Sequence, residues 1–410
     1  MKKILFIVGN YKKNSSSVST AIDNYIIDLS DEYNIDVITN RTENSDELIE
    51  VFDKVTIFRV NDYVRLFENK LINSRSCSGF FKKMFRIIYY FLFKYFRPDE
   101  GDNGWSKRRT YKVYKKITKD SKYDLIISVS DPFQSHIIAK YINKKEGIKW
   151  VSYFYDSFGL NKSRRGQFVR KILRIKNEKS VIKHSTQTLL TPELFNEYNE
   201  LKYLDNFENV IEQEYYTRRF DKENLNTNDY KGLIYVKEGY TNLIYGGNFY
   251  DKIRNPQYMF RILTNIELET RFNIIIMSNY SREKISSLNI DTNNLSIHEI
   301  QNHDVFINNM HMADFLISVG NTVNSQVPAK IFQYMETGKP IIHFSKIAND
   351  PVERYLKDYK NSLIVFETND TQQNIKLVSQ FIKMHQGSII LEISENKSAL
   401  NQFKEILDRG

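Results

Sequence analysis

The sequence predicts an α/β protein made of two successive domains, each built on a parallel sheet. Apolar runs at 4–8, 123–130 and 315–319 have the length and continuity of strands that are buried on both faces. Polar loops and helical stretches separate such runs, so strand and helix alternate along the chain. The chain has 410 residues, which exceeds one ordinary core, and its 41% of hydrophobic residues suffices for two cores.

The N-terminal half opens with a strand at 4–8, a polar loop at 9–17, a helix at 18–29 and a strand at 35–39. The loop lacks the G-x-G-x-x-G fingerprint of dinucleotide sites. We interpret this polar loop as one that contacts an acceptor substrate. The alternative is an ordinary solvated connection.

Three polar residues of this half are candidate acceptor contacts. Asp131 follows the strand at 123–130, and Asp156 follows the strand at 150–155, so both lie where parallel sheets bind ligands. Asp131 precedes a proline and is equally typical of a helix cap, an explanation that Asp156 lacks. His136, on the helix that begins near Pro132, is either a general base or acceptor contact, or a packed or surface residue.

The segment 80–97, FFKKMFRIIYYFLFKYFR, contains no acidic residue. Placed on a helix, its basic side chains share one face and its apolar side chains the opposite face. This pattern predicts a helix lying in a membrane interface, and a core helix with an exposed cationic edge is the alternative. The predicted membrane-binding residues are Lys82, Lys83, Arg86, Lys94 and Arg97. The basic run at 164–174 either extends this surface or is a solvated helix face.

The composition excludes several classes of protein. The single cysteine, Cys77, excludes an internal disulfide framework and a cysteine-based metal site. The first apolar run is too short for a secretory signal, and no uncharged stretch approaches the ~20 residues of a spanning helix. The formal charge of +9 suits a phosphorylated ligand or an anionic membrane face, and no RNP or OB pattern supports nucleic acid. We expect a cytoplasmic protein, soluble or attached to a membrane surface.

The C-terminal half repeats the alternation after an irregular polar stretch at 205–240. We expect an N-terminal domain at 1–210, a C-terminal domain at 211–391, and a last helix in 392–410 that packs back on the first domain. The predicted strands of the second domain are 242–245, 274–277, a short one near 297, 315–319, 341–342 and 362–366. Its predicted helices begin at 255 or 256 and span 305–312, 329–335 and 371–385.

The stretch 319–342, VGNTVNSQVPAKIFQYMETGKPII, predicts a strand, a polar loop, a helix and a second strand. Pro328 suits the first turn of that helix. The backbone amides of Gln326, Val327, Ala329 and Lys330 would stand at its start without intrahelical partners, where they can hold an anion such as a phosphate.

A second anion-suited loop follows the strand at 242–245. Gly246, Gly247 and Asn248 form a turn that lets a ligand approach the backbone closely. Arg254 stands seven residues after Gly247, and its planar fork suits a pyrophosphate. Together with Lys330 it could clamp a diphosphate leaving group and stabilise the charge that develops there.

The combination of DLIISVSDP, FYDSF, YGGNFYDKIRNP, ADFLIS and QVPAKIFQYMETGKPII resembles bacterial glycosyltransferases of the GT-B fold, most of all glycosyltransferase family 4. The resemblance spans most of the chain and is tighter in the second half. It implies two Rossmann-like domains facing each other across a cleft. It also implies a nucleotide-sugar donor held mainly by the C-terminal domain, an acceptor held by the N-terminal domain, and no metal or other cofactor.

Within this resemblance, Gly247 and Arg254 match the glycine turn and the phosphate-binding basic residue of the family. The family's two glutamates, eight positions apart, fall on Ser325 and Gln333, and neither is acidic. An amide still binds ribose hydroxyls, more weakly than a carboxylate, and Glu336 near the same helix face could compensate.

The resemblance implies a hexosyltransferase that uses a UDP-sugar, with retention of configuration. The expected acceptor is a lipid-linked or glycan molecule in the assembly of a capsule or similar surface polysaccharide, at the inner face of the cytoplasmic membrane. Two alternatives stay open: a nucleotide-sugar epimerase of the same fold, and a non-catalytic assembly partner docked on the membrane.

Overall fold

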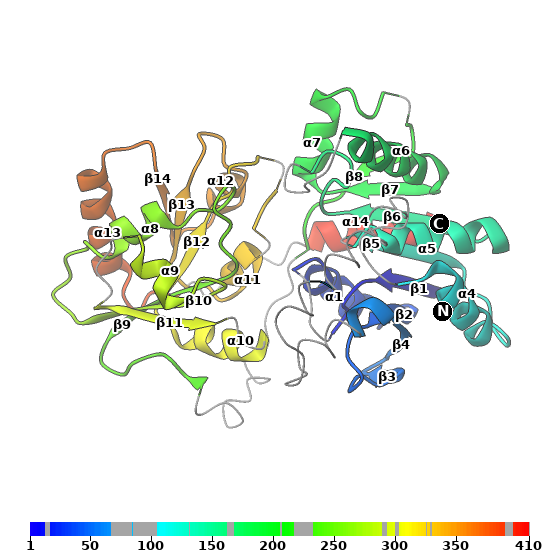
Figure 1. Cartoon of the computed structure of the whole chain (residues 1–410), viewed down its shortest axis with the longest axis horizontal. Coiled ribbons are helices and arrows are strands. Elements are labelled where there is room, and N and C mark those ends of the chain that lie inside the picture. The colour runs from blue at the N-terminus through cyan, green and yellow to red at the C-terminus, as the bar shows by residue number, and fades with distance from the viewer. Residues whose placement is uncertain are drawn as a thin grey trace. The chain divides into compact units, whose positions relative to one another are not determined.

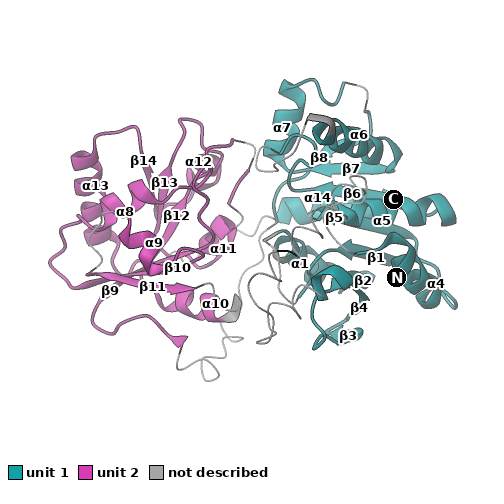
Figure 2. Ribbon diagram, viewed as in Figure 1, with its two compact units in different colours: residues 1–216, 396–410 teal, residues 217–395 magenta. Residues whose placement is uncertain are grey.

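The structure is a computed structural model, and it divides the chain into two compact units (Figure 2). Unit 1 contains 1–216 and 396–410, and unit 2 contains 217–395. The sequence placed these boundaries at 210 and 391. The residues that the structure describes are 1–12, 17–66, 84, 105–130, 132–161, 168–205, 207–216, 233–288, 293–299, 303–324, 326–328, 330–389 and 397–409.

Unit 1 is built on a mainly parallel sheet (Figure 1). Its described strands follow the order β3-β4-β2-β1-β5-β6-β7-β8, and β3 alone among them runs antiparallel to its neighbour. The strands are β1 (Lys3–Val8), β2 (Asn34–Arg41), β3 (Ile49–Phe52), β4 (Val55–Asn61), β5 (Leu125–Ser130), β6 (Lys149–Phe154), β7 (Gln187–Leu190) and β8 (Val210–Glu212). The helices described in this unit are α1 (Ser17–Leu29), α4 (Lys107–Ile117), α5 (Gln134–Glu146), α6 (Phe168–His184), α7 (Pro192–Glu200) and α14 (Lys397–Arg409).

The central strands of unit 1 are buried because helices cover both faces of the sheet. Ile4 to Ile7 of β1 have no exposed surface, and β5 is buried along its whole length. This burial explains why both strands read as continuous apolar runs rather than as alternating ones.

The last helix, α14, belongs to unit 1 although it follows unit 2 in the sequence. The ammonium of Lys2 donates to the carbonyl of Leu407 at 2.6 Å, and the hydroxyl of Tyr33 donates to Asp408 at 2.8 Å. The two ends of the chain therefore lie together on the first domain.

Unit 2 is built on a parallel sheet with the strand order β11-β10-β9-β12-β13-β14 among its described residues. The strands are β9 (Thr241–Gly246), β10 (Phe272–Ser278), β11 (Leu295–Glu299), β12 (Phe315–Val319), β13 (Ile341–Ser345) and β14 (Ser362–Phe366). The described helices are α8 (Gln257–Leu263), α9 (Arg282–Ser286), α10 (His303–Met312), α11 (Lys330–Glu336), α12 (Val352–Leu356) and α13 (Thr371–His385).

The strand order of unit 2 reverses between β9 and β12. From β9 the chain proceeds outward through β10 and β11, and it then returns to pair β12 with the other side of β9. Such a switch point opens a crevice at the carboxyl ends of the two strands, where open α/β sheets bind their ligands.

The structure confirms the predicted α/β class with two parallel-sheet domains. The strands at 315–319 and 362–366 and the helix at 371–385 have the predicted bounds. The strands β3 and β4 and the helix α4 were not predicted, and β3 is an edge strand whose side chains are mostly exposed.

The predicted membrane segment at 80–97 lies outside the described residues, apart from Met84. Among the helices that the structure does describe, none is long and apolar enough to cross a bilayer.

Candidate functional site

The candidate site lies at the switch point of unit 2, where the loops after β9 and β12 meet. β9 and β12 pair in parallel, so their carboxyl ends stand at the same edge of the sheet. The loop after β9 carries the Gly246 turn and Arg254, and the loop after β12 leads to Lys330. The topology therefore brings together the two segments that the sequence singled out.

The glycine turn at the end of β9 is packed against aromatic rings. A side chain at Gly246 would place its Cβ only 2.0 Å from a ring carbon of Phe306. The amide of Gly246 donates to the hydroxyl of Tyr334 at 3.3 Å. Gly247 adopts φ +150°, a conformation that side chains disfavour. Both glycines are thus required by the packing and backbone of this turn.

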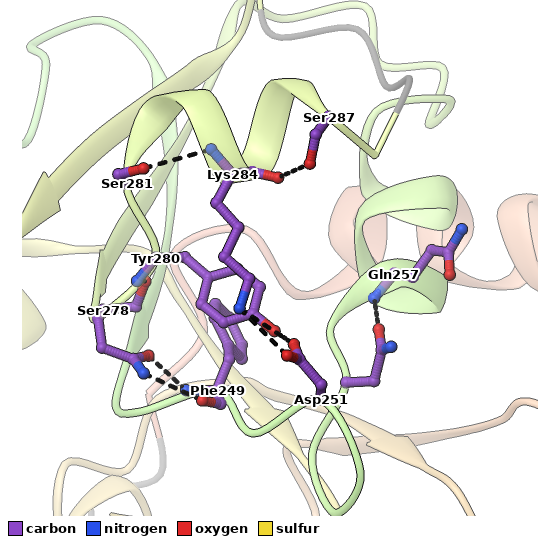
Figure 3. Close-up of polar contacts among 10 residues, drawn as sticks. Phe249, Asp251, Gln257, Ser278, Tyr280, Ser281, Lys284 and Ser287 are labelled. Atoms are coloured by element: carbon purple, nitrogen blue, oxygen red, sulfur yellow. Dashed lines mark hydrogen bonds and ion pairs between the residues drawn. The ribbon is translucent and has the colours of Figure 1, made fainter.

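Arg254 ends a short hairpin that follows the turn. Tyr250 and Arg254 form an isolated bridge, in which the amide of Arg254 donates to the carbonyl of Tyr250 at 2.8 Å. Figure 3 shows Asp251 of this hairpin bound by Tyr280 and Lys284. These contacts tie the hairpin to the segment that follows β10 and to α9.

The loop after β12 is anchored by a buried polar network. His343 bonds Ser318 at 3.0 Å through one ring nitrogen and Asp350 at 3.1 Å through the other. A side chain at Gly320 would place its Cβ 1.9 Å from a carboxylate oxygen of Asp350. The amide of Gly320 also donates to the carbonyl of Phe344 at 2.9 Å. The beginning of the loop therefore has a fixed position.

Two direct contacts join the loop after β12 to the Arg254 hairpin. The amide of Thr322 donates to the carbonyl of Ile253 at 2.8 Å. The side chain of Asn321 accepts a hydrogen bond from Nε of Arg254 at 3.0 Å and donates to the carbonyl of Gln326 at 2.9 Å. The two loops are thus one connected structure.

Lys330 and Arg254 act on each other electrostatically within this structure. The ammonium of Lys330 lies 3.7 Å from the centroid of the Phe306 ring, over its face. Burial, and after it the charge of Arg254, lowers the pKa of Lys330 to about 8. Burial raises the pKa of Tyr245 to about 12, although the charge and hydrogen bond of Arg254 oppose that rise.

Neither cation is neutralised by a carboxylate within the described part of the chain. The contacts of Arg254 there are with Asn321, Tyr245 and backbone, and Lys330 contacts the Phe306 ring. Both side chains are half-buried. Two like charges that share a partly desolvated site without a counter-charge favour the entry of an anion.

The other predicted donor residues that the structure describes lie on the same two loops and on α11. Asn248, Gln326 and Val327 are half-buried in the two loops. Gln333 and Glu336 are half-buried on α11, which has seven residues and hence a small dipole. The anion site therefore rests on the two side chains more than on the helix start. Ser325 and Ala329 lie outside the described residues.

Asp156 occupies the predicted place at the carboxyl end of β6 in unit 1, where it is half-buried. Its loop is held by the buried carboxylate of Glu178, which accepts from the amides of Phe158 at 2.6 Å and Gly159 at 3.2 Å. Burial, and then mainly the charge of Glu193 with a smaller part from Asp156, raises the pKa of Tyr215. Asp156 stays a predicted acceptor contact.

The predicted role of His136 is wrong. Its side chain has no exposed surface, one ring nitrogen bonds Ser128 at 2.7 Å, and the ring lies against Phe133 and Phe154. Burial lowers its pKa to about 3, so the ring is neutral. His136 is a packed core residue that cannot touch an acceptor. Asp131 lies outside the described residues.

The remaining predicted positions are not described. Lys82, Lys83, Arg86, Lys94 and Arg97 all fall in 67–83 and 85–104. Within the described ranges, no group of three or more His, Cys, Asp and Glu side chains is arranged to hold a metal ion.

Three residues of the site were not predicted from the sequence: Phe306, Asn321 and Tyr334. Phe306 comes from α10 and Tyr334 from α11, and both reach Gly246 only through tertiary packing. Asn321 gave a local signal, because it directly follows Gly320 at the end of a predicted strand.

Because Gly246 packs closely against Phe306, we expect a larger residue at this position to destabilise the protein. Gly246→Ala should lower the free energy of unfolding by about 1–3 kcal/mol, because the ring must move to admit a methyl group. Chemical denaturation measures this change. The cost should shrink when Phe306 is leucine, since the smaller side chain leaves room. An alanine variant as stable as the original protein would contradict the packing.

Comparisons of the sequence with protein-family models and with curated proteins find no match. Solved structures match over the whole chain at low sequence identity. Sucrose-phosphate synthase from Thermosynechococcus elongatus has 10% identity and a TM-score of 0.60, with 100% of this chain and 99% of that chain covered. Anabaena HepE in complex with UDP and glucose has 9% identity and a TM-score of 0.57, with 100% of both chains covered. TarM has 11% identity and a TM-score of 0.60, with 99% and 98% covered. These similarities show a GT-B fold of two Rossmann-like domains.

Proposed function

We propose that the chain is a retaining glycosyltransferase that moves a hexosyl group from a UDP-sugar to a lipid-linked or glycan acceptor in surface polysaccharide assembly. The observation that carries the proposal is that Arg254 and Lys330 both lie at the switch point of unit 2: Arg254 is bonded to Asn321 of the loop after β12, and the Lys330 side chain lies against Gly247 of the loop after β9. Structures of this fold with UDP, glucose or UDP-2-fluoro glucose bound support the choice of a uridine nucleotide.

Arg254 and Lys330 would hold the diphosphate of the donor. In the transfer, the bond between the anomeric carbon and the diphosphate oxygen breaks, and UDP leaves with the bonding electrons. The acceptor hydroxyl oxygen forms the new bond to that carbon and gives up its proton to the departing phosphate. Two cations that are fixed before the reaction stabilise the negative charge that grows on the leaving group.

The other residues would position the donor around these cations. Gly247 lets the donor approach the backbone, and the amides of Gln326 and Val327 would contact the diphosphate. Gln333, with Glu336 beside it, would bind the ribose hydroxyls. Asp156 of unit 1 would contact the acceptor.

We also propose that the protein docks on a membrane surface. The basic and aromatic pattern of 80–97 supports docking on an anionic lipid surface, which would bring the enzyme to a lipid-linked acceptor at the inner face of the cytoplasmic membrane. Sedimentation with phosphatidylserine vesicles tests this, and protein that stays in the supernatant at low salt would contradict it.

A screen of UDP-, GDP- and dTDP-sugars by thermal unfolding tests the proposed donor. A ligand at 100 times its Kd stabilises the native state by about 2.7 kcal/mol, so one UDP-sugar should raise the Tm by several degrees. That sugar should then yield UDP only when an acceptor is added. Interconversion of the sugar without an acceptor would favour an epimerase, and stabilisation by no UDP-sugar would sink the proposal.

A further inference from the structure

We propose that Asn321 is a positioning residue of the donor site, which aims the Arg254 guanidinium at the diphosphate while leaving its charge intact. The inference rests on the proposed function, because it assigns a purpose to a residue that joins the two anion-suited loops. Asn321 would touch Arg254 and the loop backbone rather than the reacting atoms.

Both ends of the Asn321 amide are used. Its oxygen accepts from Nε of Arg254 at 3.0 Å, and its nitrogen donates to the carbonyl of Gln326 at 2.9 Å. A guanidinium only donates and a carbonyl only accepts, so these partners fix which end of the amide points where. The residue is 4% exposed, which limits the competition of water for either bond.

The contact with Nε determines which nitrogens remain for a ligand. With Nε engaged by Asn321, the two terminal nitrogens of Arg254 carry the donors that can grip a pair of oxygens. The hydrogen bond at the inner nitrogen thus works together with the hydrogen bond to Tyr245 to set the plane of the guanidinium. Without the Asn321 contact the long side chain would be held by Tyr245 alone and would have more rotamers open to it.

The neutrality of Asn321 matters as much as its shape. An aspartate here could hold Nε equally well, but its charge would offset that of Arg254 inside a half-buried site. The site would then attract an anion less strongly. An amide orients the cation and keeps both positive charges available.

The second bond extends the effect to the segment that leads to Lys330. Gln326 precedes Lys330 by four residues, and the hydrogen bond to its carbonyl holds the loop that leads into α11. Asn321 therefore fixes the position of the Arg254 side chain and also that of the loop that leads to Lys330. A change at this residue should disturb both.

Calorimetric titration with UDP tests the inference on the full chain. Asn321→Ala should weaken UDP binding roughly 10-fold or more, because Arg254 loses its orientation and the loop its anchor. Asn321→Asp, an isosteric change, should weaken it at least as much. The aspartate should also move the decline of UDP affinity with pH to higher pH, because a carboxylate beside Arg254 relieves the repulsion felt by Lys330.

Asn242→Ala is the matched control. Asn242 is 3% exposed at the start of β9, at the opposite edge of the same sheet, and its amide also donates to and accepts from backbone. Its loss should destabilise unit 2 comparably and leave UDP affinity unchanged.

A double-mutant cycle with Arg254→Ala separates positioning from general damage. In the Arg254→Ala background, Asn321→Asp should cost clearly less UDP affinity than it does in the original protein, since there is no guanidinium left to orient or neutralise and only the loop contact remains to be lost. Additive losses, or Asn321 variants that bind UDP like the Asn242 control, would overturn the inference while leaving the proposed function standing. An original protein that binds no UDP would overturn both.

Discussion

Arg254→Ala is expected to lower the affinity for UDP on the order of 100-fold while the protein stays folded. Truncating one member of a partly buried charge pair typically costs about 2–5 kcal/mol of binding free energy, and about 1.4 kcal/mol corresponds to a factor of ten. The backbone of Arg254 keeps its bridge to Tyr250 in this variant, so the hairpin should persist. Calorimetric titration gives the affinity, and circular dichroism checks the fold.

Arg261→Ala is the control for this result. Arg261 is an exposed arginine on α8 of the same unit, so its loss removes the same charge from outside the site. It should change UDP affinity little, because exposed charges are screened by salt. Equal affinities of the Arg254 and Arg261 variants would show that the guanidinium at 254 does not contact the ligand.

UDP affinity is also expected to fall as the pH rises above the pKa of Lys330. Burial and the charge of Arg254 lower that pKa to about 8, so the ammonium of the unliganded site begins to lose its proton there. A bound diphosphate favours the charged form and raises the pKa again, so binding at this pH takes up a proton. Titrations from about pH 7 to about pH 10, in buffers with different ionisation enthalpies, measure both effects.

The same pKa shift has a defined consequence for the unliganded protein. Because the folded-state pKa is lowered from 10.5 to about 8, the unfolded chain binds more protons between these values. The contribution of this group to the free energy of unfolding therefore rises with pH across that window. UDP affinity thus falls with rising pH, whereas the contribution of Lys330 to the free energy of unfolding rises. This opposite response identifies a lysine inside the binding site.

Lys330→Met should remove the pH dependence of UDP binding in this window and leave a weak, flat affinity. Lys376→Met, at an exposed position of α13, should retain the dependence of the original protein. A Lys330→Met variant that still shows the decline would mean that another group titrates.

The strands and loops that form the site could be predicted from the sequence, because the sequence patterns that indicate them are local. The strand at 315–319 is a continuous apolar run that ends at Gly320, and it has the predicted bounds. Arg254 and Lys330 each follow a strand by a short loop, and parallel strands place such loops at one edge. Arg254 and Lys330 lie at the same site because β9 and β12 are paired neighbours in the sheet.

Packing between distant segments could not be predicted in the same way. His136 suggested chemistry because histidine titrates near neutral pH, but the neighbours that bury it, Ser128 and Phe154, belong to two other elements. Glu178 lies on a helix whose basic residues suggested a solvated face, yet it is fully buried and holds the loop after Asp156. Phe306 supports Lys330 from a helix that showed no sign of belonging to the site.

A comparison of the binding of UDP and of uridine to the unaltered protein, in one calorimetric experiment, is the sharpest test of the diphosphate site. The two ligands share the base and ribose, so their difference in affinity reports the diphosphate alone. Arg254 and Lys330 predict that UDP binds at least about 100-fold more tightly than uridine. Equal affinities, or no detectable binding of UDP, would contradict a diphosphate site at the ends of β9 and β12.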